Sequence, residues 1–304
     1  SVTIYGIVDA NLGKDIGSDD KRMGQGAQSR LGFRGTEDLG GGLSAYFLFE
    51  HRFKPADGGL VNPASFWQGS SLVGLRGGFG SVSLGRTYTT SFLGSQLRAD
   101  PWGFDTVAAN TAILTGGTGS GTAATGLATV RNASAITYNF AASGFTFGAQ
   151  IAEGDKNGGD EKAWNLAGGY TAGPITVGVS YESTATDGKW ATINGAYDLG
   201  MVKLGAFLGK GETGDNADRK SYLLTATAPI AGGELRASFG ELKGQAAAGG
   251  ADDKIRRQAG LGYFYPLSKR TTVYANVATA KTDLAFGNGD DSDTGYDFGI
   301  KHTF

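Results

Sequence analysis

The stretch Thr294-Gly-Tyr-Asp-Phe-Gly-Ile-Lys-His-Thr-Phe304 decides which fold class the sequence predicts. The residues of one parity are mostly apolar: Tyr296, Phe298, Ile300 and Phe304, with His302 as the polar exception. The residues of the other parity are polar or small: Asp297, Gly299, Lys301 and Thr303. Such alternation predicts a β-strand with one apolar face and one wet face, which occurs in soluble sandwiches as well as in membrane barrels. The rest of the chain must therefore decide between these two folds.

The same alternation recurs along the whole chain and predicts about sixteen strands. In residues 29–37, for example, Leu31 and Phe33 alternate with Arg30 and Arg34. The other alternating segments are residues 2–11, 43–52, 65–76, 81–86, 136–140, 145–151, 164–170, 175–181, 193–197, 202–208, 222–226, 235–239, 261–265, 273–277 and 294–304. Charged residues on one parity of an otherwise apolar strand are typical of a wall between lipid and water.

The connections between these segments alternate between short turns and long polar loops. The short turns are residues 38–42, 77–80, 142–144, 172–174, 199–201, 229–233 and 266–269. The long loops are residues 15–26, 55–63, 87–129, 153–161, 211–218, 244–253 and 283–293. Short turns at one end and long loops at the other are typical of outer-membrane barrels. The sequence therefore predicts an all-β fold: a 16-stranded antiparallel transmembrane β-barrel that forms a single domain over residues 1–304, with both termini at the short-turn end.

The composition excludes several classes of functional site. The chain has no cysteine and two histidines among 304 residues, so disulfides, thiolate metal sites and histidine-based zinc or triad chemistry are not expected. The formal net charge of −2 provides no field that would favour nucleic acid as a partner. We therefore expect no catalytic residue, no cofactor and no resident metal.

Alternatives to a plain channel remain open at this stage. An outer-membrane barrel hydrolase would need His51 or His302 beside a serine, and no surrounding motif indicates such a nucleophile. A soluble β-sandwich or lectin is the other alternative, although a sandwich has no reason to segregate its turns from its loops. The acidic residues 290–293 are candidates for loop-bound Ca²⁺, which prefers oxygen ligands, although no glycine-spaced ligand pattern follows them.

The hairpin Ser29-Arg-Leu-Gly-Phe-Arg-Gly-Thr-Glu-Asp-Leu-Gly-Gly-Gly-Leu-Ser-Ala-Tyr-Phe-Leu-Phe-Glu50 is the longest of several motifs with a family likeness. Shorter motifs of this kind are residues 1–9, 79–86, 130–134, 265–271 and 299–304. Together they closely resemble trimeric porins of Gram-negative bacteria, especially the β-proteobacterial and neisserial type. Because the motifs lie at both ends and in the middle, the resemblance covers the whole chain.

This resemblance implies a homotrimer in the outer membrane of a Gram-negative bacterium, in contact with membrane lipid and lipopolysaccharide. It implies passive diffusion of small hydrophilic solutes, and hence no enzymatic reaction. It also implies that the third long loop, residues 87–129, folds into the lumen as a constriction. The small or flat outward residues Gly6, Val8 and Ala10 agree with a trimer, because such a face suits the packing of protein against protein.

The resemblance further implies a ladder of basic residues on the wall that faces acidic residues on this loop. The candidates in this chain are the basic residues Arg30, Arg34, Arg76, Arg86 and Arg131 and the acidic residues Asp100 and Asp105. Arg34 and Arg76 are included because residues 68–70 lack an arginine that many relatives carry. Arg86 can join the ladder only if Gly85 lies in a β-bulge, since strict alternation would turn it towards lipid.

The charges of the constriction predict a weak to moderate preference for anions. The acidic loops lie in water at the mouth, where salt screens a charge within about 8 Å. The arginines act over shorter distances at a lower effective dielectric, so they should dominate. We expect inorganic anions and small hydrophilic solutes to pass. A porin biased towards small organic anions would show the same features and remains an alternative.

Overall fold

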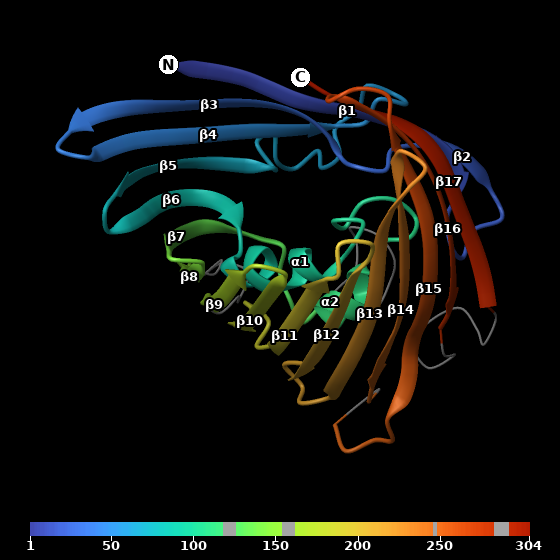
Figure 1. Ribbon diagram of the computed structural model, residues 1–304. Coiled ribbons are helices and arrows are strands. Elements are labelled where there is room, and N and C mark those ends of the chain that lie inside the picture. Colours follow the sequence, from blue (N-terminus) through green and yellow to red (C-terminus); the bar gives the residue numbers. More distant parts are fainter. Residues whose placement is uncertain (118–125, 154–161, 246–247, 283–291) are drawn as a thin grey trace.

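The computed structural model describes residues 1–117, 126–153, 162–245, 248–282 and 292–304, which form one closed antiparallel sheet (Figure 1). Its strands are β1 (Val2–Lys14), β2 (Lys21–Gly24), β3 (Ser29–Gly40), β4 (Leu43–Phe53), β5 (Ser70–Gly77), β6 (Gly80–Tyr88), β7 (Arg131–Ala142), β8 (Phe145–Ala152), β9 (Ala163–Ala172), β10 (Ile175–Ser183), β11 (Lys189–Asp198), β12 (Lys203–Glu212), β13 (Asp218–Ile230), β14 (Gly233–Gly244), β15 (Asp253–Pro266), β16 (Thr271–Lys281) and β17 (Ser292–Thr303). The short β2 pairs with β1 and continues the line of β3, so these 17 strands make a sixteen-stranded wall. The predicted 16-stranded antiparallel barrel is thus confirmed.

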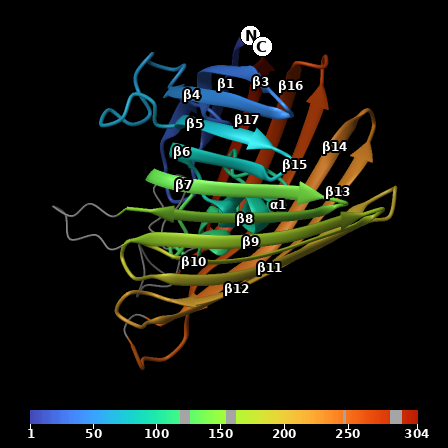
Figure 2. The ribbon, with the colours of Figure 1, turned by 90° about the vertical axis from the view of Figure 1, so that its left-hand side faces the viewer.

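The first and last strands close the barrel. β1 pairs antiparallel with β17 from Ile7 opposite Thr303 to Lys14 opposite Tyr296. At the end of this seam, Gly6 and Phe304 exchange two backbone hydrogen bonds of 3.1 Å. β1 and β17 therefore lie side by side, and the N-terminal residues of β1 extend beyond the C-terminus (Figures 1 and 2). Because hydrocarbon offers no water to an open sheet edge, this seam completes the backbone pairing that a membrane-spanning sheet needs.

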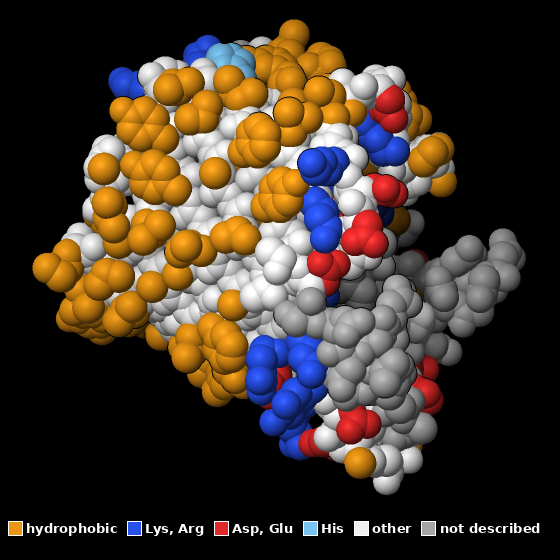
Figure 3. Space-filling view, turned by 90° about the vertical axis from the view of Figure 1, so that its right-hand side faces the viewer, with side chains coloured by type: hydrophobic (Ala, Val, Ile, Leu, Met, Phe, Trp, Pro, Cys, Tyr) orange, Lys and Arg blue, Asp and Glu red, His pale blue; other side chains and the backbone are white. Residues whose placement is uncertain are grey.

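The two faces of the wall have opposite chemistry. The outward side chains Leu261 and Val277 are 48% and 43% exposed, whereas the inward Asn276 and Asp297 are 5% and 1% exposed. Figure 3 shows apolar side chains spread over the outer wall and charged side chains gathered towards the loop end. An apolar outer surface of this extent is stable against the hydrocarbon of a membrane.

The segment between β6 and β7 folds inside the barrel against one side of the wall. It contains η1 (Phe92–Gln96), α1 (Leu97–Ala99) and α2 (Thr111–Thr115), which contact strands β8 to β14 (Figure 1). The inward face of β11–β15 is apolar at this level, and its side chains bury Ile113 and Leu114 of α2: Trp190, Phe207, Leu223, Leu242 and Ile255. This internal core anchors the segment to the inner face of β11–β15. No helix in the described part of the chain has the length and apolar character to cross a membrane.

Adding a single methyl group at the seam should destabilise the barrel. A Cβ on Gly6 would lie 2.4 Å from Phe304 Cζ and 2.5 Å from the Arg30 carbonyl oxygen. We expect Gly6→Ala to lower the free energy of unfolding by about 1–3 kcal/mol, as overpacking does, in urea titrations of the protein in lipid vesicles. Gly168→Ala is the matched control, since this outward glycine of β9 has its nearest neighbour at 3.7 Å. Equal losses in both variants would contradict the importance of the seam.

Candidate functional site

Arginines from three neighbouring strands, β3 to β5, lie on the inner face of the wall. Arg30 and Arg34 lie on the same face of β3. The cross-strand register places Arg52 of β4 directly opposite Arg30. Arg76 of β5 lies opposite Ser44 on that same face. The guanidinium of Arg34 lies 5.2 Å from the centroid of the Tyr5 ring, and that of Arg76 lies 4.3 Å from the centroid of Tyr46. Flat aromatic faces therefore steady both side chains without neutralising their charge.

Arg86 is placed by the β-bulge that an inward orientation requires. The pairing of β6 with β7 shifts register between Gly85 and Thr87. Gly85 has a φ of +125°, and a Cβ there would lie 2.1 Å from the Ser71 carbonyl oxygen, so only glycine fits. Arg86 Nε then donates a 2.8 Å hydrogen bond to the Gln68 carbonyl oxygen. The bulge at Gly85 that an inward Arg86 requires is present.

Arg131 and Arg52 meet at Tyr88, and with Arg30 and Arg86 they form what we call the arginine cluster. Arg131 lies 3.9 Å from the centroid of the Tyr88 ring, and its Nε donates to the Gly69 carbonyl oxygen over 2.8 Å. Arg52 Nη2 donates to Tyr88 Oη over 3.0 Å. The cluster gathers four guanidinium groups from β3, β4, β6 and β7. Such crowding of like charge is costly unless an anion offsets it.

Glu50 is the carboxylate that offsets part of this charge. Its Oε1 lies 2.6 Å from Arg52 Nη2, and its Oε2 accepts a 3.0 Å hydrogen bond from Tyr5 Oη. Glu50 and Arg52 were not among the residues predicted for the site, although they share the parity of the inner face on β4. Their alternation with Phe49 and His51 was the signal that could have identified them.

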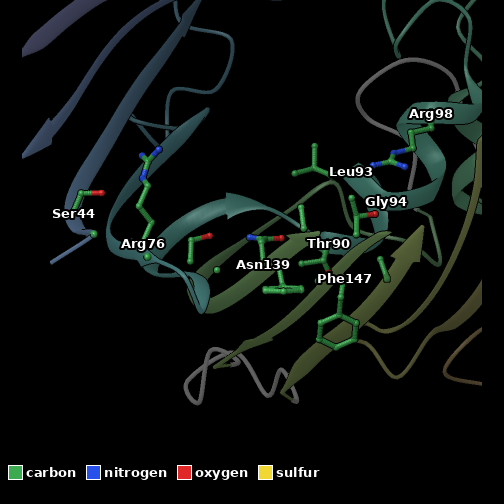
Figure 4. A pocket seen from close by; sticks show the side chains of 17 residues that line it. Ser44, Arg76, Thr90, Leu93, Gly94, Arg98, Asn139 and Phe147 are labelled. Atoms are coloured by element: carbon green, nitrogen blue, oxygen red, sulfur yellow. The ribbon is translucent and has the colours of Figure 1, made fainter. Parts of the chain in front are cut away.

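Arg98 of α1 is a further functional candidate that the sequence did not indicate, because the resemblance implied only acidic residues on the loop. Together with Arg76 it lines a cavity of about 610 Å³. Figure 4 shows the two arginines on opposite sides of this cavity, Arg76 on the wall and Arg98 on the loop. The loop therefore contributes positive as well as negative charge to the lumen.

Asp100 organises the loop from within. It is 5% exposed and accepts hydrogen bonds from the backbone N–H groups of Trp102, Phe104 and Asn110 and from the side chain of Asn110. Burial raises the pKa of its carboxyl group, and these hydrogen bonds oppose the rise. They hold a turn in which Phe104 has a φ of +66°, a left-handed conformation that needs such support. The structure thus places Asp100 inside the loop, with its oxygens occupied by loop donors.

Asp105 lies at the tip of the same turn and is partly exposed. Burial raises the pKa of its carboxyl group to about 6, with smaller upward contributions from Asp9 and Asp100, whereas Lys301 and Arg30 lower it. Lys301 and Arg30 belong to β17 and β3, so Asp105 faces the wall on the side of the barrel seam. Of the two predicted acidic residues, Asp105 is the one that the structure brings towards basic wall residues.

Metal binding finds little support in the part of the chain that the structure describes, where no three histidine, aspartate or glutamate side chains gather to hold an ion. The predicted Ca²⁺ site falls largely on residues 290 and 291, which lie outside the described residues. Its last member, Asp293, accepts hydrogen bonds from Lys14 Nζ and from the backbone N–H of Gly17.

Comparison with known proteins identifies relatives over the full barrel. The sequence pattern of Gram-negative porins matches residues 1–285. Outer membrane porin protein 32 of Delftia acidovorans is 34% identical, over 100% of this chain and 94% of its own length. A major outer membrane protein of Neisseria meningitidis is 40% identical over 76 residues, 24% of this chain. The solved anion-selective porin from Comamonas acidovorans superposes with a TM-score of 0.81 at 31% identity, covering 100% of this chain and 99% of the other.

Lowering the pH from 8 to 5 should raise the preference of the pore for anions. Asp105 binds a proton as the pH falls through about 6, and the lumen then loses one negative charge. In Asp105→Asn this charge is absent at every pH. The preference for anions should therefore be high at every pH and should not change as the pH falls through about 6. The measurement is the zero-current potential across a planar bilayer under a KCl gradient, recorded at several pH values.

Asp100→Ala serves as the matched carboxyl control. Because Asp100 holds the turn through four hydrogen bonds, its loss should make the single-channel current noisier and leave the pH step in place. A step that persists unchanged in Asp105→Asn would assign the titration to another group.

Proposed function

The chain belongs to the Gram-negative porin family, and from this premise we propose that its barrel passes small hydrophilic solutes by passive diffusion with a preference for anions. The protein is an outer-membrane porin and not an enzyme, as its family establishes. The hydrolase alternative is therefore dropped, and the question that remains is which solutes the lumen favours.

The excess of guanidinium groups in the arginine cluster is the observation that carries the anion preference. Within the cluster of Arg30, Arg52, Arg86 and Arg131, Glu50 is the carboxylate that forms an ion pair, with Arg52, and it also binds Tyr5. Asp105 of the loop adds one further negative charge, on the side of Arg30. Two unit charges about 6 Å apart interact by about 3 kcal/mol at an effective dielectric of 20. A cation that passes the cluster is repelled on this scale, before screening by salt, and an anion is attracted.

The segment of residues 87–129 is the constriction in this proposal. Its described part packs on the apolar inner face of β11–β15 and so narrows the lumen from that side. Asp105 lies on the side of Arg30, and Arg98 faces Arg76 across the cavity on the short-turn side. An ion therefore meets wall arginines on one side and a mixed loop surface on the other. In this proposal the predicted arginines supply positive charge to the constriction from the wall, and Asp105 supplies negative charge from the loop.

A bias towards small organic anions is a second candidate, favoured by unpaired donors in the arginine cluster. Gln68 Nε2 and Arg52 Nε are buried and have no hydrogen-bond acceptor within the described residues. Arg86 and Arg131 bind backbone carbonyls through Nε, which leaves their Nη groups for a carboxylate that accepts two parallel hydrogen bonds. If this bias exists, succinate in the bath should reduce the chloride current at concentrations at which sulfate does not.

We also propose that three copies assemble through the outer face near the seam, where Gly6, Val8 and Ala10 permit close packing. Unheated samples in mild detergent should then migrate as a heat-sensitive species of about three chains' mass. The rest of the outer wall contacts membrane lipid and, in the outer leaflet, lipopolysaccharide. A monomeric particle by light scattering would contradict the trimer.

Removing the charge of Arg131 should reduce the anion preference more than any other single wall substitution. Arg131 binds the carbonyl oxygen of Gly69, and its guanidinium lies over the ring of Tyr88. We expect Arg131→Ala to lower the chloride-to-potassium permeability ratio by about two- to fourfold, as the loss of one screened charge at this range implies. The measurement is the zero-current potential under a KCl gradient.

Two controls separate charge from structure. Arg131→Lys keeps the charge and should retain most of the preference, while Arg270→Ala removes a charge from an exposed turn and should change nothing. Long-lived ohmic openings of the wild type in planar bilayers test the porin proposal itself. A wild type that prefers cations, or an Arg131→Ala channel with unchanged selectivity, would place the controlling charges elsewhere.

A further inference from the structure

We propose that the outer wall of β12–β15 carries, at its loop end, a binding site for the phosphate groups of outer-leaflet glycolipid headgroups. The site consists of Lys210, Lys220, Lys243 and Lys254, which we call the lysine row. It rests on the proposed outer-membrane function in one respect, namely that the loop end of the barrel meets the outer leaflet. The anion-selective lumen takes no part in it.

The four lysines stand directly beside one another on adjacent strands. The register pairs Lys210 with Lys220, Lys220 with Lys243, and Lys243 with Lys254. Neighbouring strands lie about 4.8 Å apart, so the row extends over about 14 Å. All four side chains are exposed, and the adjacent Ser221 and Leu242 are buried on the inner face. The lysine row is therefore on the outside of the barrel.

A β-bulge brings the fourth lysine into the row. Strict alternation would place Lys254 on the inner face together with Arg256 and Gln258. The register instead shifts between Leu242 and Lys243, so that Leu242 pairs with Arg256 and Lys243 with Lys254. Ile255 is the extra residue, and it is 1% exposed within the internal core. The bulge thus turns Lys254 outward beside Lys243.

The row lies immediately next to the lipid-facing part of the wall. On β12, the next outward residue after Lys210 towards the turn end is Leu208. On β13 and β14, the second outward residues after Lys220 and Lys243 are Leu224 and Phe239. Leu208, Leu224 and Phe239 are 58%, 55% and 41% exposed. An outward step of two residues covers about 6.8 Å, so the ammonium groups stand where hydrocarbon gives way to headgroups. Figure 3 shows basic side chains along this boundary between the apolar wall and the loop end. A soluble polyanion would not need such a boundary, whereas a lipid headgroup does.

The positive charge of the row is only partly neutralised by the protein. Lys220 pairs with Asp252 at 3.0 Å, and Glu241 binds both Lys243 at 3.2 Å and Arg257 at 2.7 Å. Lys210 and Lys254 have no carboxylate at ion-pair distance within the described residues. Like charges directly opposite each other destabilise a sheet, so phosphates that bridge neighbouring lysines would relieve a repulsion that the fold maintains. A glycolipid headgroup with two phosphates matches a row of this length.

Binding of a bisphosphorylated lipid A to the folded full-length protein in neutral detergent tests the proposal. The wild type should bind this lipid, and the variant Lys210→Gln/Lys220→Gln/Lys243→Gln/Lys254→Gln should bind it at least about tenfold more weakly, since each lysine near an anionic surface contributes. Lys269→Gln/Arg270→Gln, which removes two charges from a turn at the other end, should bind as the wild type does.

A second readout keeps the test valid if the quadruple variant folds poorly. In the wild type, the bisphosphorylated lipid should protect Lys210, Lys220, Lys243 and Lys254 from acetylation in mass spectrometry and leave Lys269 reactive. The same glycolipid without phosphates, and inorganic phosphate alone, should protect much less. Equal protection by either of these probes, or undiminished binding by the quadruple variant, would overturn the site. The variant should keep wild-type conductance and selectivity, so a wild type that fails to conduct would count against the porin proposal and not against the lysine row.

Discussion

Backbone pairing in a medium without water is the constraint on which the rest of this structure depends. Every strand must find a partner on both sides, and the seam between β1 and β17 provides the last one. Once the sheet is closed, the register of each pair decides which side chains face lipid and which face the lumen. A slip by one residue would exchange the two faces of a strand. The seam therefore protects the charge pattern of the lumen as well as the stability of the wall, and at Gly6, packed under Phe304, it leaves no room for a side chain.

At the level of α2 the inner face of the barrel is apolar on β11–β15, whereas it carries arginines on β3–β7, and this division shapes the channel. On β11–β15 the inward side chains Trp190, Phe207 and Leu223 form a hydrophobic core with α2, which anchors the loop. On β3–β7 the inward side chains are arginines held by Tyr88, Glu50 and backbone carbonyls. The hydrophobic effect thus draws the loop to one side, and the charges that it leaves uncovered line the other. In the proposed function, the preference for anions follows from this asymmetry and not from the net charge of −2.

The candidate site could be predicted from the sequence as far as alternation extends. Arg30, Arg34 and Arg76 lie on strands with unbroken period-two patterns, and each is on the inner face. Arg86 can face inward only through a β-bulge. Gly85 permits such a bulge, and the register shift between Gly85 and Thr87 shows that it is present. Asp100 and Asp105 looked equivalent in sequence, yet the first is enclosed by loop hydrogen bonds and the second faces basic wall residues. Loop residues have no period, so only the folded turn could distinguish them.

The number of strands, their order, the two faces of the wall and the separation of turns from loops follow from the amino-acid sequence alone. They depend on local alternation and on turn residues, which act between neighbours in the chain. The partners of Glu50, the internal core beneath α2 and the outward position of Lys254 depended on the tertiary structure. Each results from contacts between residues far apart in the chain, or from a bulge that resets the alternation within a strand. A period of two determines a face only until the first extra residue, and beyond that point the pairing with the next strand decides which way a side chain points.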